Sequence, residues 1–236
     1  MAPGDAIPGA LPADGRGGVP TSEPRWPAAV AVLVAIALYV SLPGKFISAS
    51  FGSNIIRFVV PGLELALLIP LAVTTPHRHV SESGKRRKVA VALTAIVSIA
   101  NIAALGLLVH YLLFAGAAVQ SRQLLLAAAQ IWWTNVIVFA LWYWELDGGG
   151  PPARLRSPGA PRDFAFVQMT DPEVAAHGWH PRFVDYFYVS FTNASAFSPT
   201  DTMPLTHWAK QLMLAQATVS IVTLLLVAAR AVNILH

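Results

Sequence analysis

Hydroxyl, amide and carboxylate side chains are densest between residues 190 and 201, within a stretch that is otherwise apolar and aromatic. The polar candidates there are Thr192, Asn193, Ser195, Ser198, Thr200 and Asp201. At membrane depth such groups can replace the hydration shell of an ion or solute, so they are candidates for the lining of a pore. Ser, Thr and Asn also satisfy tight turns and bond neighbouring helices, so a packing role stays open beside the pore role.

Five further polar residues fall inside apolar segments. They are Glu64, Arg57, His110, Asn101 and Asn135. An ionisable residue within a bilayer is costly, so Glu64, which follows the Pro-Gly break at 61–62, is a functional candidate, with a structural ion pair as the alternative. Arg57 lies two turns earlier on the same helical face. His110 could titrate or bond an asparagine, and both asparagines are explained most simply by bonds between helices.

Signatures of enzymes and metal centres are lacking in the sequence. The absence of cysteine excludes disulfides, thiolate metal sites and cysteine nucleophiles. The histidine pairs at 77/79 and 177/180 supply fewer ligands than the three or four that a metal centre usually needs. No phosphate-binding loop, nucleophile elbow or zinc-protease motif occurs. We therefore expect no enzyme activity, no cofactor and no metal, and the net charge of +4 does not indicate a nucleic-acid partner.

The composition indicates which environment holds these side chains. Of the 236 residues 55% are hydrophobic and only 12% are charged, against about 25% charged in soluble domains, and the mean hydropathy is +0.56. Five segments are long enough to cross a hydrocarbon core of about 30 Å. They are residues 26–42, 55–75, 89–115, 124–144 and 211–229. We expect an all-α, polytopic membrane helical bundle that has the lipid bilayer as its partner.

The chain divides into four regions by composition. Residues 1–25 are rich in Pro, Gly and Ala and are expected to be disordered, 26–145 hold four spans, and 146–180 are a Gly/Pro-rich loop. In the last region, 181–236, an aromatic stretch bounded by Pro181 and Pro199 is too short to cross. It predicts a re-entrant half-helix before the final span, with Pro181 at the first helical position and Asp185 near the positive end of the helix dipole.

The basic residues divide unevenly between the two sides of a five-span protein. Twelve lie on the side of the N-terminus: Arg16, Arg25, Arg78, Lys85, Arg86, Arg87, Lys88, Arg154, Arg156, Arg162, Arg182 and Lys210. Four lie on the other side: Lys45, Arg57, Arg122 and Arg230. By the positive-inside rule the N-terminus, the loop 77–88 and the connection 146–210 face the cytoplasm, and the C-terminus lies outside.

The run Asp201-Thr202-Met203-Pro204-Leu205-Thr206-His207-Trp208-Ala209-Lys210 resembles the segment that follows the selectivity filter in potassium channels. More closely, residues 130–235 look like a bacterial membrane-protein family of unknown function that is suspected of kinship with channel pore domains. This resemblance implies a location in the bacterial inner membrane, a homo-oligomer that is a tetramer if channel-like, and a monovalent cation as the permeant species.

One departure from the channel pattern is decisive for selectivity. A potassium filter needs glycines, because only Gly cheaply adopts the positive φ that points successive carbonyls inward, and this chain has no glycine after Gly178. The charge count also places the re-entrant loop inside, whereas channel pore loops face outside. We therefore expect an oligomeric, channel-like pore that is not potassium-selective; the alternative is a non-conducting membrane scaffold or accessory subunit.

Overall fold

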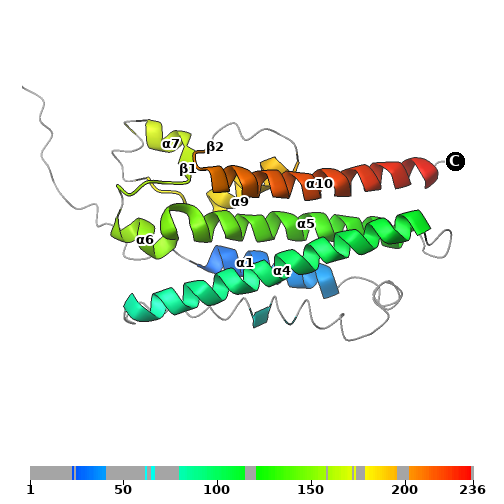
Figure 1. Ribbon diagram of the computed structural model, residues 1–236, viewed down its shortest axis with the longest axis horizontal. Helices are drawn as coiled ribbons and strands as arrows, with labels where there is room; N and C mark the ends of the chain where they lie inside the picture. The colour runs from blue at the N-terminus through cyan, green and yellow to red at the C-terminus, as the bar shows by residue number, and fades with distance from the viewer. Residues whose placement is uncertain are drawn as a thin grey trace, which may run out of the picture.

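The computed structural model describes residues 23, 25–40, 62, 65–66, 80–114, 121–157, 159–171, 173, 179–195 and 202–234. Most of these residues are helical, and one short antiparallel ribbon joins two distant segments (Figure 1). The elements in chain order are α1 (Trp26–Val40), α4 (Val80–Phe114), α5 (Ser121–Leu146), η2 (Asp147–Gly149), α6 (Pro151–Arg156), β1 (Phe164–Phe166), α7 (Val167–Thr170), α9 (Phe183–Ala194), β2 (Thr202–Pro204) and α10 (His207–Ile234).

Helix α5 occupies the centre of the bundle, with α1, α4, α9 and α10 packed around it (Figure 1). In its apolar window 72% of residues are buried, against 28% in α4 and 17% in α10. Small residues of α5, such as Ala127, Ala128 and Ala140, are buried against the neighbouring helices. Small side chains let helix backbones approach closely, which favours association in lipid, where the hydrophobic effect does not drive helices together. The central helix therefore carries most of the contacts that hold the bundle together.

Three helices in the described part of the chain are long and apolar enough to span a membrane: Arg87–His110, Leu124–Arg154 and His207–Ala229. They confirm the expected third, fourth and fifth segments as apolar helices of that length. The first expected segment forms α1, which has 15 residues and is shorter than a full span. The second, 55–75, lies almost wholly outside the described residues.

One end of the bundle gathers segments that are far apart in the sequence (Figure 1). The start of α4, the end of α5 and the start of α10 meet there, and Glu23 from the N-terminal region bonds Trp144 at the same end. Strands β1 and β2 pair antiparallel, with Phe164 opposite Pro204 and Phe166 opposite Thr202. The C-terminal end of α10 lies at the opposite end of the bundle.

The segment after α5, which we expected to be a Gly/Pro-rich loop, contains regular secondary structure. Its composition is rich in Gly and Pro, yet it folds into η2, α6 and β1, and Phe164 and Phe166 are buried in the same apolar core as Tyr143 and Trp144. The physical reason is that Gly148, Gly149 and Gly150 all take positive φ, which turns the chain back onto the end of α5. Here the glycines build a tight turn and do not act as a flexible spacer.

Helix α9 is the half-helix that the aromatic stretch predicts. It begins at Phe183, with the Arg182 backbone N–H donating to the Asp185 carboxylate at 2.7 Å, so Asp185 lies in the first turn as expected. Pro181 precedes the helix and does not take its first position, which is a small correction to the expected start.

The depth that α9 reaches follows from its contacts with α5. Phe183 stacks edge-on against Trp144 near the end of α5, and the Trp132 indole donates to the Ala194 carbonyl at 3.3 Å. These tryptophans are twelve residues apart, which is about 18 Å along a helix. After Ser195 the next described residue is Thr202, which lies in the ribbon. The start of α9 and Thr202 therefore lie at the same end of the bundle, and Ala194 lies deeper in it beside α5.

Candidate functional site

Gln216 of α10 joins three helices inside the bundle. Its amide nitrogen donates to the Ser190 carbonyl at 2.9 Å and to the Ser190 hydroxyl at 2.7 Å. Its amide oxygen accepts from the Tyr143 hydroxyl at 2.5 Å and from the Asn193 amide at 2.9 Å. The side chain is fully buried and its hydrogen-bonding capacity is used, so it fixes α9 between α5 and α10. We call Gln216, Tyr143, Ser190 and Asn193 the amide node.

Asparagines extend these polar contacts along α5. Asn135 donates to the Gln216 carbonyl at 3.2 Å and to the Ser220 hydroxyl at 2.9 Å, both on α10. Asn101 of α4 donates to the Ile131 carbonyl at 3.3 Å. Both side chains therefore form the bonds between helices that the packing interpretation of the sequence describes.

The described members of the expected filter region bond within the chain. The Thr192 hydroxyl donates back to the Tyr188 and Val189 carbonyls, and the Ser195 hydroxyl donates to the Phe191 carbonyl. Asn193 belongs to the amide node and also donates to the Met213 carbonyl. His110 is exposed on α4 and does not belong to the segment 190–201. The remaining candidates lie outside the described residues: Ser198, Thr200, Asp201, Arg57 and Glu64.

Two arginines cap the C-terminal end of α5, one from α4 and one from α6. Arg87 of α4 donates its Nε and Nη2 to the Glu145 carbonyl at 3.2 and 3.1 Å. Arg154 of α6 donates Nη1 to the Trp144 and Asp147 carbonyls at 2.7 and 2.9 Å. The last carbonyls of a helix lack partners and carry the negative end of its dipole, so both cations are well placed. They attach α4 and α6 to the central helix.

The N-terminal region is fastened to the same place by Glu23. Its buried carboxylate pairs with Arg154 at 3.0 Å and accepts from the Trp144 indole at 2.8 Å. Arg25 lies over the Trp144 ring, with 5.8 Å between its Cζ and the ring centroid. The residues just before α1 are therefore bound to the end of α5 by charge-assisted hydrogen bonds.

Two aspartates hold the ribbon and α10 against the end of α5. Asp147 is fully buried and accepts from the Asp163 and Phe164 backbone N–H groups and from the Tyr186 hydroxyl at 2.5 Å. Burial raises the pKa of Tyr186 well above 10, so the hydroxyl stays a donor at physiological pH. Asp163 accepts from Thr206, from the Trp208 indole and from the Gly148 backbone. Thr206 and Trp208 thus attach the start of α10 to the residue that precedes β1.

Glu145 stands apart from these paired carboxylates. It lies in the last turn of α5 and is 3% exposed, yet neither of its side-chain oxygens has a hydrogen-bond partner among the described residues. Charges on Arg25, Arg87, Arg154 and Glu23 act on it. We call Glu23, Arg25, Arg87, Glu145 and Arg154 the end cluster.

The sequence reasoning missed both groups for identifiable reasons. Gln216 is one of several polar residues in an otherwise apolar helix, and its partners lie 23 to 81 residues away, so no local pattern reveals it. The Glu145 and Asp147 carboxylates follow Trp142-Tyr143-Trp144, aromatic residues of the types that favour the headgroup level of a membrane. Tyr143 and Trp144 are instead fully buried. Two acidic residues ending an apolar segment beside such a run are the signal that could have been used.

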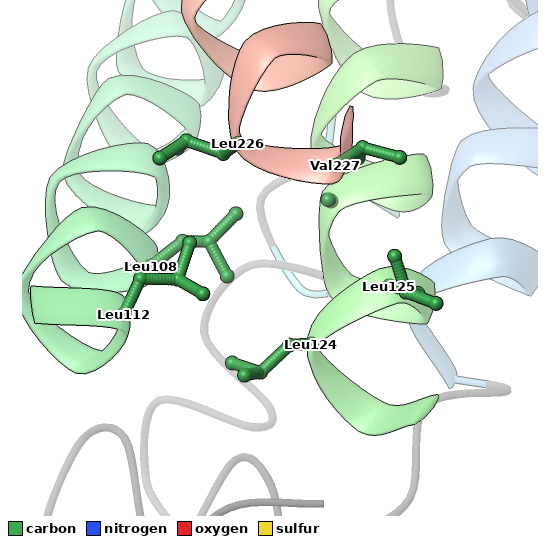
Figure 2. A pocket seen from close by; sticks show the side chains of 7 residues that line it. Leu108, Leu112, Leu124, Leu125, Leu226 and Val227 are labelled. Atoms are coloured by element: carbon green, nitrogen blue, oxygen red, sulfur yellow. The ribbon is translucent and has the colours of Figure 1, made fainter. Parts of the chain in front are cut away.

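A small cavity lies between α4, α5 and α10 toward the other end of the bundle. Figure 2 shows Leu108, Leu112, Leu124, Leu125, Leu226 and Val227 around it. The cavity has a volume of about 10 Å³, which is about the space that one water molecule needs. Its lining is apolar, so it offers no binding site for a polar solute. Among the described residues no group of His, Asp or Glu is arranged to hold a metal ion.

No protein-family model, no curated protein and no solved structure matches this chain.

Proposed function

We propose that this protein is a multi-pass protein of the bacterial inner membrane that assembles into an oligomeric pore for a monovalent cation. The observation that carries the proposal is the position of α9, which extends about 18 Å into the bundle beside α5, while Thr202, eight residues after its last residue, lies at the end where α9 begins. A half-helix that enters and leaves on one side is how pore loops bring polar groups to membrane depth.

The contacts of α9 narrow the set of pore-lining groups. Thr192, Asn193 and Ser195 are already bonded within the chain, so the polar groups left for a path are Ser198, Thr200 and Asp201. One half-helix and one span cannot enclose a path alone, so several copies must assemble around an axis. The uncovered face of α10, with Leu214, Ile221 and Leu225 exposed, is available for lipid or for a neighbouring copy.

The proposed topology has five spans, with α1 and residues 55–75 completing the three membrane-length helices. The basic segments 77–88 and 146–210 then face the cytoplasm, as the positive-inside rule requires. The meeting of the starts of α4 and α10, the end of α5 and Glu23 at one end of the bundle supports this grouping.

The test is ion flux from liposomes loaded with potassium or sodium and reconstituted with the purified chain. We expect flux of both ions, with weak discrimination between them, and a loss of at least tenfold in the Ser198→Ala/Thr200→Val/Asp201→Asn triple variant. Thr170→Ala, which changes an exposed hydroxyl of α7, should conduct like the parent chain. Native mass measurement of the same preparation should give a tetramer.

A non-conducting scaffold or accessory subunit is the second candidate. It is favoured by the bonds that Thr192, Asn193 and Ser195 make within the chain, because those groups then serve packing alone. A monomer without flux for either ion would reject the pore and support the scaffold. Unchanged flux in the triple variant would reject the assignment of the pore lining to these three residues.

A further inference from the structure

The end cluster contains a buried carboxylate, that of Glu145, whose surroundings favour a bound proton over a metal cation. Glu145 is buried and its oxygens lack hydrogen-bond partners among the described residues. An ionised carboxylate in such a place is costly unless it is paired and hydrogen-bonded. The positive charges of Arg25, Arg87 and Arg154 act on this carboxylate and oppose a metal cation there. A bound proton removes the charge and with it the cost.

Arg87 has two alternative acceptors on this one residue. It now donates to the main-chain carbonyl of Glu145, while its charge also acts on the Glu145 carboxylate. A guanidinium prefers an ionised carboxylate, which it can bind with two parallel hydrogen bonds. Arg154 is committed to Glu23 and to two carbonyls, and Arg25 lies over the Trp144 ring, so Arg87 is the group best placed to change partner.

We propose that Glu145 is a proton-binding site that controls how α4 is attached to the end of α5. With the proton bound, Arg87 caps the Glu145 carbonyl and lies against Gly150, where a Cβ would stand 2.9 Å from its Nε. When the proton leaves to water, the O–H bond breaks, the carboxylate becomes negative, and Arg87 moves from the carbonyl to the carboxylate. The contact with Gly150 is then lost and the start of α4 shifts. This switch does not depend on the proposed pore.

The charged groups around the site define which titrations matter. The residues before α1 contribute Glu23 and Arg25, α4 contributes Arg87, and α6 contributes Arg154. Of the two carboxylates in the cluster, Glu23 is bonded to Arg154 and Trp144, whereas Glu145 has no hydrogen-bond partner among the described residues. The proton is therefore assigned to Glu145.

Infrared spectroscopy of the full chain in lipid nanodiscs tests the bound proton directly. We expect the carbonyl stretching band of a protonated carboxylic acid at neutral pH, its disappearance in Glu145→Gln, and its retention in the control Glu173→Gln, which changes an exposed carboxylate. In Arg87→Gln the ionised form loses its cation, so the pH midpoint of the band should rise by about 1–3 units. A spectrum in which Glu145→Gln removes no band would overturn the proposal, as would an Arg87→Gln midpoint equal to that of the parent.

A distance measurement tests the movement. The chain has no cysteine, so spin labels can be placed at Lys88→Cys on α4 and Ser157→Cys after α6, both exposed positions. The distance between the labels should change with pH along the same single-proton curve as the infrared band, and should stay at its low-pH value in Glu145→Gln. A distance that is constant from pH 4.5 to 9 while the band titrates would reject the coupling to α4.

Discussion

At the residue scale, the side-chain amide of Gln216 joins α10 to α5 and α9 through four hydrogen bonds. A fully bonded amide contributes modestly to stability, but its removal leaves three partners with reduced bonding, of which Tyr143 and Ser190 are fully buried. Each unsatisfied buried group costs about 1–3 kcal/mol. Inside a membrane the partners relax to other acceptors in part, which lowers the total. The position of α9 therefore depends strongly on this one side chain.

We predict that Gln216→Leu lowers the free energy of unfolding by about 2–4 kcal/mol. Unfolding by SDS in mixed micelles, followed by tryptophan fluorescence, measures this change. Gln211→Leu is the matched control, because Gln211 is exposed on the same helix and its replacement should change stability by less than about 0.5 kcal/mol. Equal losses in the two variants would show that the amide node does not hold α9.

At the scale of elements, the end of α5 is where α4, α6, the ribbon and the N-terminal region meet, and three glycines make the meeting possible. Gly150 has φ +90°, and a Cβ there would lie 2.8 Å from the Glu145 carbonyl oxygen and 2.9 Å from Arg87 Nε. The first of these atoms is backbone and cannot move away cheaply. Strain at such a φ costs about 1–3 kcal/mol for a residue with a side chain.

We expect Gly150→Ala to lower the unfolding free energy by at least about 2 kcal/mol, because the φ strain and the displaced Arg87 act together. Gly159→Ala is the control, since no atom lies within 4 Å of the Cβ position there. Thermal unfolding of both variants in the same detergent provides the comparison. A Gly150→Ala protein as stable as Gly159→Ala would contradict the role given to the turn.

The sequence predicts helices more readily than it predicts these junctions. Apolar length is sufficient for the spans because a bilayer forces every backbone group into internal hydrogen bonds, and the length between Pro181 and Pro199 is sufficient for α9. In sequence, the turn after α5 resembles a flexible linker, because a local pattern shows only its high content of Gly and Pro. Asp147 bonds backbone groups 16 and 17 residues away, and β1 pairs with a strand far downstream, so neither leaves a periodic signal.

At the scale of the whole molecule, the arrangement separates two ends with different composition. The ribbon end contains the end cluster, the aspartates and the starts of α4 and α10, and the other end contains the apolar cavity and the end of α10. In the proposed topology these ends face opposite sides of the membrane. The absence of cysteine makes this sidedness simple to measure.

Single cysteines at Met203 and Ser157, both exposed at the ribbon end, should react with a membrane-impermeant maleimide from the same side of sealed inverted vesicles. A cysteine added after His236 should react only in vesicles of the opposite orientation, because α10 crosses between them. Labelling of Met203→Cys and Ser157→Cys from opposite sides would reject the re-entrant path of α9. Labelling of all three from one side would reject α10 as a span.

The amide node also sets a condition on how the protein is made. Tyr143 enters the membrane with α5. Its hydroxyl donates a hydrogen bond to the amide oxygen of Gln216, which is 73 residues further along the chain. At synthesis rates of about 5–20 residues per second, roughly 4–15 seconds separate the two. During that interval Tyr143 and Asn135 face the translocon or lipid without their final partners. The bundle therefore closes last at α10, and a chain truncated before this helix should be an early substrate for membrane proteases.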